Sequence, residues 1–178
     1  DQADILRIKS QEQRVRGQQV LLEVEDEADS QSDSSKKVTA NKEVFLICGA
    51  PGSGKTTYVQ QQRQPGDLII DMDTIASALT GDNSAHPDYS NILDVAVAVR
   101  NTVYNIIESG AGDWKRAFVI TSSMNDDAIN VLAKQLHATV HYMETTKAEC
   151  KRRIASDKTR QDKEVFYKLV DEWFENRA

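Results

Sequence analysis

The sequence contains no apolar stretch near the roughly 20 residues that a membrane-spanning helix needs, and its first residues lack the basic-then-apolar order of a secretory signal peptide. Cysteine is scarce: the 178 residues include two, Cys48 and Cys150, which stand far apart, and the three histidines are scattered. These absences exclude a disulfide framework and a cysteine–histidine metal site. We therefore expect a cytoplasmic protein that does not contact a membrane, with Cys48 as a small buried side chain.

The sequence also lacks an excess of positive charge, since its formal net charge is −6. This balance argues against a protein that coats nucleic acid. One segment, 145–168, differs because it contains eight basic and four acidic residues. A local basic patch on an acidic protein suits a small anionic ligand, so nucleic acid is expected only as the end of a chain that serves as acceptor.

Residues 1–43 differ in composition from the rest of the chain. Apolar residues up to Val24 could line part of an amphipathic helix, and the polar stretch 25–37 is typical of a flexible linker. We predict an N-terminal arm over 1–43 and a compact domain over 44–178. Two interpretations of the arm stay open: an appended tail, or a helix that docks on a protein partner.

From residue 44 onward, strand and helix patterns alternate, which predicts an α/β fold with a mainly parallel sheet. We expect three layers, with about four to five strands and helices on both faces. Strands are predicted at 44–48, 68–71, 117–121 and 138–143. Helices are predicted at 54–63, 73–80, 91–109, 126–136, from 145, and at 162–175.

Residues 49–56 read G-A-P-G-S-G-K-T, a full match to the phosphate-binding loop G-x-x-x-x-G-K-[ST] between a strand and a helix. Such a P-loop holds a nucleoside triphosphate with inward-pointing backbone amides and with the N-terminus of the following helix. We expect Lys55 to reach the β- and γ-phosphates and the Thr56 hydroxyl to ligate Mg²⁺. The predicted nucleotide-binding residues are Gly49, Ala50, Pro51, Gly52, Ser53, Gly54, Lys55, Thr56 and Thr57.

The second predicted strand ends in Asp71-Met72-Asp73, at the sheet edge where α/β proteins bind ligands. Residues two apart in a strand point to opposite sides, so one carboxylate would face the phosphates and the other an acceptor. A carboxylate in that place can accept the proton of a hydroxyl that attacks the γ-phosphoryl group. The simpler interpretation is that Asp73 caps the next helix.

The third predicted strand lacks the Asp-Glu pair that ATP-driven motors place after an apolar strand. Thr121-Ser122-Ser123 follows instead, and no carboxylate occurs before Asp126. This disfavours a motor or a hydrolase and favours transfer to a hydroxyl, with Mg²⁺ held by Thr56 and Asp71. The hydroxyl cluster either contacts the acceptor or is simply a polar strand end.

The basic segment offers guanidinium groups that could stabilise the charge of the transferring phosphoryl group. Arg152, Arg153 and Arg160 are the candidates. The alternative is a solvated helix face with ion pairs such as Glu149–Arg153.

Together these motifs resemble P-loop kinases, in particular the kinase domain of phage polynucleotide kinases and the zeta-toxin branch. The resemblance covers roughly residues 43–176. Residues 69–74 are similar to the end of strand two in the zeta branch, which implies Asp73 as the base. Residues 140–146, followed by Arg152-Arg153, are similar to the strand before the lid helix, which implies Arg153 as a lid arginine.

Two positions depart from that pattern. Polynucleotide kinases carry an arginine one turn past the base, where this sequence has Ile75, Ala76 and Ser77. The second lid arginine is out of register and falls at Arg160, or is replaced by Lys158.

The sequence therefore predicts a P-loop kinase that uses ATP and Mg²⁺ and transfers the γ-phosphate to a hydroxyl. The acceptor would be a nucleoside, a nucleotide sugar or a nucleic-acid 5′ end. Catalysis would involve Asp73 as the base together with Lys55, Arg153 and Arg160, and Asp71 would support the metal or the base. The alternatives are a nucleotide-dependent binding module, whose arm engages a partner, and a slow hydrolase.

Overall fold

The computed structural model describes residues 42–123 and 125–177. The strands are β1 (Glu43–Cys48), β2 (Leu68–Ile70), β3 (Arg116–Thr121) and β4 (Thr139–Tyr142). The helices are α2 (Lys55–Gln62), α3 (Met72–Thr80), the 3-10 helix η2 (Ser90–Ile92), α4 (Leu93–Ser109), α5 (Asp126–Gln135), α6 (Lys147–Ser156) and α7 (Lys163–Glu175). The predicted arm over 1–43 lies outside the described residues except for its last two positions.

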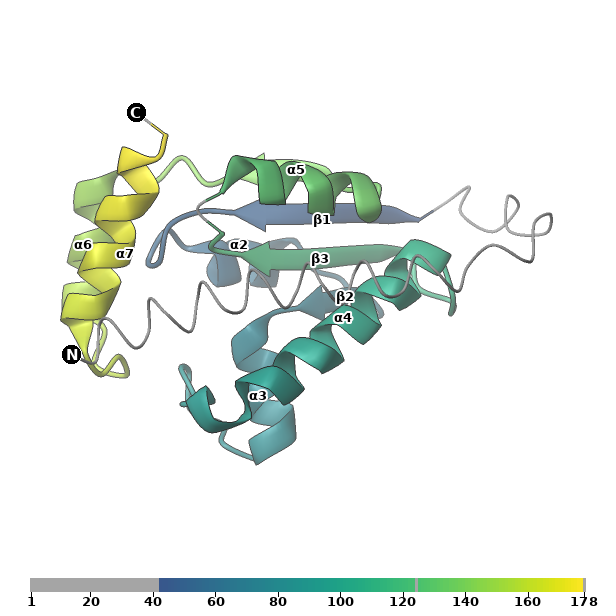
Figure 1. Ribbon diagram of the computed structural model, residues 1–178, viewed down its shortest axis with the longest axis horizontal. Helices are drawn as coiled ribbons and strands as arrows, with labels where there is room; N and C mark the ends of the chain where they lie inside the picture. Colours follow the sequence, from purple (N-terminus) through teal and green to yellow (C-terminus); the bar gives the residue numbers. More distant parts are fainter. Residues whose placement is uncertain (1–41, 124, 178) are drawn as a thin grey trace. The chain divides into compact units, whose positions relative to one another are not determined.

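The four strands form one parallel sheet in the order β2-β3-β1-β4 (Figure 1). Strand β1 is central, with Leu46 opposite Val119 on β3 and opposite Val140 on β4. The predicted α/β fold with a small parallel sheet is confirmed. All four carboxyl ends point to the same edge, so loops that follow different strands meet there.

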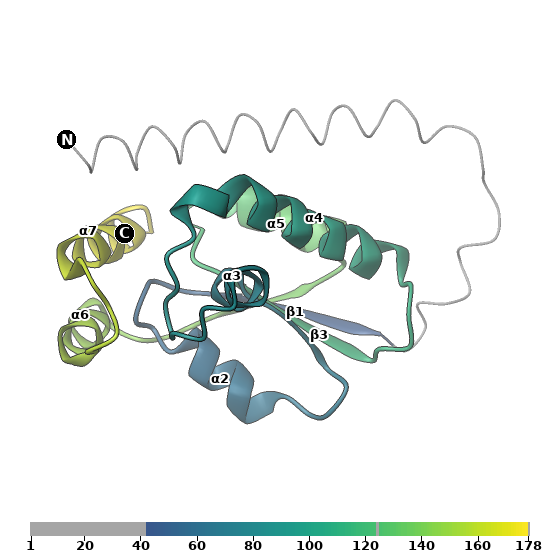
Figure 2. The ribbon, with the colours of Figure 1, turned by 90° about the horizontal axis from the view of Figure 1, so that it is seen from below.

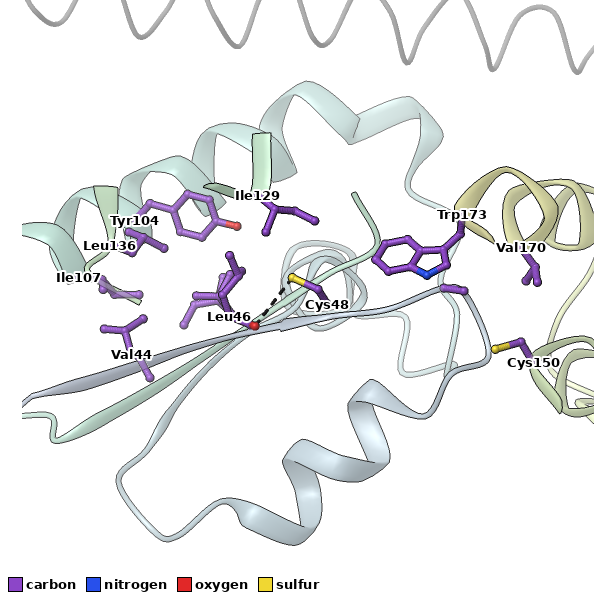
Figure 3. Packing of buried hydrophobic residues seen from close by; sticks show 14 of the residues in the cluster. Val44, Leu46, Cys48, Tyr104, Ile107, Ile129, Leu136, Cys150, Val170 and Trp173 are labelled. Atoms are coloured by element: carbon purple, nitrogen blue, oxygen red, sulfur yellow. Dashed lines mark hydrogen bonds between the residues drawn. The ribbon is translucent and has the colours of Figure 1, made fainter. Parts of the chain in front are cut away.

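Side chains of β1 alternate between two apolar layers because successive residues of a strand point to opposite faces. Val44, Leu46 and Cys48 pack into the larger cluster, which includes Ile107 from α4 and Ile129 from α5. Figure 3 shows these side chains between the sheet and α4. On the other face, Ile47 of β1 packs with Val59 from α2 and Phe118 from β3. Both faces are thus covered.

Figure 2 shows α4 and α5 on one face and α2 on the other, with α6 and α7 beyond the carboxyl ends of the strands. The predicted three layers are therefore confirmed. Among the helices of the described part of the chain, none has the length and apolar character needed to cross a membrane. Cys48 is fully buried, as predicted, and its Sγ lies 3.8 Å from the Leu46 carbonyl oxygen.

Helix ends follow the expected cap chemistry. Gly110 ends α4 in the left-handed region at φ 67°, and its amide donates to Ile106 and Ile107. This end confirms the helical interpretation of 91–109, with a short 3-10 turn before Leu93. Asn125 caps α5, because its side chain accepts from the amides of Asp127 and Ala128.

The end of β2 corrects two details of the sequence interpretation. The strand stops at Ile70, so Asp71 occupies the N-cap position of α3 and Asp73 lies in the first turn of that helix. Asp73 is therefore not the helix cap, and the alternation of a strand does not separate the two carboxylates. Negative charge is favourable at a helix N-terminus, which explains why two aspartates are tolerated there.

Candidate functional site

The loop 49–54 connects β1 to α2 at the carboxyl edge of the sheet. Gly52 and Gly54 have φ angles of 75° and 94°, in the left-handed region that glycine tolerates. The amide of Ser53 donates to the Ala50 carbonyl over 3.1 Å, which closes the turn. Helix α2 starts immediately afterwards, so its unpaired amides point toward the loop interior.

Lys55 lies inside this loop with 8% of its surface exposed. Its Nζ donates to the carbonyl oxygens of Gly49, at 2.7 Å, and Ala50, at 2.9 Å. Burial lowers the pKa of Lys55 to about 8, because desolvation disfavours the charged form. Thr56 and Thr57 are exposed at the start of α2, so the Thr56 hydroxyl is open to a ligand.

Two observations test whether the loop suits a phosphate and a metal ion. Within the described residues, the Ser53 hydroxyl is buried without a hydrogen-bond partner, so it is free to donate a hydrogen bond to a phosphate oxygen. In the same residues, no three histidine, cysteine or carboxylate groups come together to hold a metal. The exposed Thr56 hydroxyl at the start of α2 is the group of this loop that would hold Mg²⁺ together with bound phosphates.

Asp71 and Asp73 are both half-buried beside this loop. Burial and then the neighbouring charge of Asp73 raise the pKa of Asp71, whereas Lys55 lowers it. In turn, the charge of Asp71 raises the pKa of Lys55 against its desolvation. Asp71 therefore lies close enough to the loop lysine for the two charges to interact.

Two side chains that the sequence interpretation missed contact Asp73. The Nδ1 atom of His86 lies 3.0 Å from Asp73 Oδ2. Burial, followed by the charges of Asp73 and Asp71, raises the pKa of Tyr89 to about 12. Both residues belong to the segment between α3 and α4. The sequence offered one indication of their position. The segment follows a helix that begins at the carboxyl edge of the sheet, where α/β proteins bind ligands.

Helix α6 brings one of the predicted arginines onto the loop. Arg153 donates from Nη1 to the Ser53 carbonyl over 3.1 Å and from Nε to Glu149 over 2.8 Å. Arg152 also binds Glu149, but its side chain is 68% exposed and lies on the solvent side. The two arginines hold the pKa of Glu149 down at about 2.

Arg160 lies in the turn between α6 and α7, with a side chain that is 14% exposed. Its guanidinium stands 4.4 Å from the centre of the Phe166 ring, and its Nε lies 3.2 Å from Asp157 Oδ2. The charge of Arg160 lowers the pKa of Lys55, so this guanidinium also lies near the loop. Arg153 therefore contacts the loop directly, and Arg160 lies close enough to Lys55 for their charges to interact. Both belong to residues 147–162, the segment that the sequence predicts as a lid and that is called the lid below.

The hydroxyl cluster after β3 makes local contacts. The Thr121 hydroxyl accepts from the Ser123 amide over 3.1 Å, as at an ordinary polar strand end. The next carboxylate, Asp126, forms an ion pair with Arg177 at the end of α7. Asp126 is therefore engaged in packing α7 against α5.

We expect Gly52→Ala to weaken both stability and nucleotide binding. An added Cβ would lie 2.7 Å from the Cys150 carbonyl oxygen, in a backbone at φ +75°. The left-handed backbone alone costs about 1–2 kcal/mol, and the contact forces the loop away from α6. Gly66→Ala is the matched control, because Gly66 has φ +91° and no atom within 4 Å of the added Cβ. Thermal unfolding and calorimetry with Mg-ATP measure the two effects; equal results for the two variants would contradict this account.

A strand, a glycine loop that surrounds its lysine, and a helix that starts at that lysine define a P-loop nucleotide-binding protein. The parallel sheet with helices on both faces is the three-layer fold in which such loops occur. Comparison of the sequence with protein families agrees: residues 44–173 match the family described as AAA domain. The chain belongs to that family of P-loop kinase-like NTPases.

Solved structures share the fold at low sequence identity. A chain of the Pnkp1/Rnl/Hen1 RNA repair complex superposes with a TM-score of 0.57 and 14% identity over 81% of this protein. The match spans 48% of that chain, so this protein corresponds to about half of its length. Shikimate kinase from Acinetobacter baumannii, in complex with shikimate, gives a TM-score of 0.48 and 19% identity, over 80% of this chain and 84% of its own. No curated protein matches the sequence.

Proposed function

We propose that this protein transfers the γ-phosphate of ATP to a hydroxyl acceptor. The observation that carries the proposal is that Asp73 and the buried Lys55 stand at the carboxyl edge of one parallel sheet, at the starts of α3 and α2. Asp71, at the N-cap of α3, lies close enough to Lys55 for their charges to interact. A phosphate-binding lysine next to a carboxylate that follows another strand supplies the two groups that a P-loop kinase needs.

In the proposed reaction, the acceptor oxygen attacks the γ-phosphorus while its proton passes to the Asp73 carboxylate. The bond from the γ-phosphorus to the bridging oxygen breaks, and ADP leaves with that electron pair. Lys55 and the loop amides stabilise the growing charge on the leaving oxygen. Asp73 then returns its proton to water.

The lid arginines would supply positive charge opposite the transferring phosphoryl group. Arg153 and Arg160 would stabilise the equatorial oxygens of the transferring group, since both guanidinium groups lie near the loop. Mg²⁺, held by Thr56 and assisted by Asp71, would neutralise negative charge on the β- and γ-phosphates. Asp71 is suited to this role because a cation would counteract the burial that raises its pKa.

The acceptor we propose is a nucleoside, a nucleotide sugar or a nucleic-acid 5′ end. Helix α3 contains no arginine that could bind a phosphate group of the acceptor. Ile75 and Ala76, one turn after Asp71, pack toward the core instead. We further propose that 44–178 is the catalytic domain, that 1–43 is an arm which can bind a protein partner, and that the protein acts in the cytoplasm.

Incubation with γ-labelled ATP and a panel of nucleosides, sugars and 5′-hydroxyl oligonucleotides tests the proposal. Label that appears on one acceptor class supports a kinase and identifies the substrate. If the protein binds Mg-ATP but leaves all label on it, the protein is instead a nucleotide-dependent binding module, which the missing arginine of α3 favours. Label released as inorganic phosphate in the absence of acceptor would indicate a hydrolase.

A further inference from the structure

His86 joins the two sides of the candidate site. Its Nδ1 lies 3.0 Å from Asp73 Oδ2 on α3, and its Nε2 lies 3.3 Å from Asp157 Oδ2 at the end of α6. The three residues belong to separate parts of the chain, and Asp157 is 71 positions beyond His86. The ring is 26% exposed, and Pro87 beside it is buried, which anchors this part of the loop.

Both partners of His86 are carboxylates, which only accept hydrogen bonds when ionised. An imidazole donates from both ring nitrogens only in its protonated form, so the imidazolium is the form that satisfies both contacts. Asp157 stays ionised in its surroundings. Two hydrogen bonds from Thr159 and the neighbouring His86 hold the pKa of Asp157 at about 2, despite some desolvation. The ring therefore sits between two carboxyl groups, and its protonated form can donate to both at once.

The contact continues from Asp157 to the lid arginine. Arg160 Nε lies 3.2 Å from the same Oδ2 atom that faces His86. The amide and the hydroxyl of Thr159 donate hydrogen bonds to Asp157 Oδ1 over 2.9 and 2.6 Å. These bonds fix the orientation of the Asp157 carboxylate. Asp73, His86, Asp157 and Arg160 thus form a continuous series of polar contacts, from the proposed base to the lid.

We propose that His86 is a positioning residue for phosphoryl transfer. One ring nitrogen fixes the rotamer of Asp73 toward the acceptor, and the other holds Asp157, which in turn orients Arg160 at the phosphates. The inference rests on the proposed function for its effect on catalysis. Its effect on nucleotide binding through Arg160 is independent of any acceptor.

Two nearly isosteric variants separate the contacts. The amide nitrogen of Asn in His86→Asn occupies the place of Nδ1, so the Asp73 contact survives and the Asp157 contact is lost. The amide nitrogen of Gln in His86→Gln reaches the place of Nε2 and keeps the Asp157 contact instead. We expect His86→Asn to weaken Mg-ATP binding about three- to tenfold and His86→Gln to lower kcat about tenfold with the Kd for Mg-ATP nearly unchanged.

His137→Asn is the matched control, because His137 is exposed at the end of α5 with a φ of 50° that asparagine tolerates. Thermal unfolding of all variants verifies that they fold. Calorimetry on His86→Asn, Arg160→Ala and the double variant then tests the series directly. Because both changes interrupt the same series of contacts through Asp157, the double variant should bind Mg-ATP about as weakly as Arg160→Ala alone.

Independent, multiplying effects on the Kd would overturn the proposal, as would a His86→Asn protein that binds Mg-ATP like the unaltered chain. These outcomes concern nucleotide binding. They therefore differ from a failure of the proposed function, which would show as tight Mg-ATP binding without label on any acceptor. A His86→Gln protein with unchanged kcat on a true acceptor would refute the part of the proposal that concerns Asp73.

Discussion

Asp73→Asn is expected to reduce phosphoryl transfer by about 10²–10⁴-fold while leaving ATP affinity within a few fold. Asparagine has the shape of aspartate but cannot accept the proton of the attacking hydroxyl. In the proposed mechanism the nucleotide is held by the loop 49–57 and the lid, so its binding should survive the change. Single-turnover transfer to the acceptor identified with labelled ATP gives the rate, and calorimetry with Mg-ATP gives the affinity.

Asp113→Asn controls for the loss of one negative charge, because Asp113 is exposed before β3, at the opposite edge of the sheet. Its transfer rate should equal that of the unaltered protein. If Asp73→Asn retained full activity, Asp73 would have no part in the mechanism. A loss of ATP affinity as large as the loss of rate would instead assign Asp73 to nucleotide binding.

Lys55→Met is expected to weaken Mg-ATP binding by about 10²-fold and to abolish turnover, since a charged hydrogen bond to a phosphate in a buried site is lost. Methionine fills a similar volume, so the loop retains its packing. Calorimetry measures the loss, and Lys115→Met, at an exposed position before β3, is the control for charge. Tight binding by Lys55→Met would mean that the loop does not hold the nucleotide in the way described here.

The same lysine gives a pH prediction. Burial lowers the pKa of Lys55 from about 10.5 to about 8, so the cationic form that binds phosphate dominates below pH 8. Affinity for Mg-ATP should fall as the pH rises above that value, and Lys55→Arg should remove this fall because arginine stays charged. An unaltered protein with constant affinity from pH 7 to pH 10 would contradict the prediction.

A rise in pH should change the stability of the protein in the opposite direction to its affinity for Mg-ATP. Between about pH 8 and pH 10.5, the unfolded chain binds the proton of Lys55 more tightly than the folded chain does. The free energy of unfolding therefore gains a contribution from Lys55 as the pH rises through this window. The buried cation of Lys55 therefore lowers the free energy of unfolding at neutral pH. Such a loss of stability in favour of ligand binding is common at binding sites.

The sheet and its helices were predictable because their signals are local. The predicted helices 91–109 and 126–136 end and begin at Gly110 and Asn125, residue types that favour helix ends, and the loop motif placed Lys55 at the start of a helix. The arrangement around Asp73 was not predictable in the same way. It depended on whether β2 ended at Ile70 or continued through Asp71. In the structure Asp71 is the N-cap of α3 and Asp73 lies in the first turn of that helix.

The contacts of His86 were also beyond the reach of the sequence. A histidine next to a proline in a polar loop indicates a surface turn, and nothing in the local pattern links it to Asp157. The contact depends on how α3, α4 and α6 pack around one edge of the sheet. The roles assigned to the candidate residues, and the arm over 1–43, stay predictions that the proposed experiments test.

One carbonyl oxygen joins the loop before Lys55 to the segment that forms α6. Ser53 accepts a hydrogen bond from the Thr145 hydroxyl at 2.8 Å and another from Arg153 at 3.1 Å. Thr145 lies just before α6 and Arg153 lies within it, so two hydrogen bonds on one acceptor tie this segment to the loop that precedes Lys55. A change that shifts the Ser53 carbonyl would therefore disturb both contacts of the α6 segment at once.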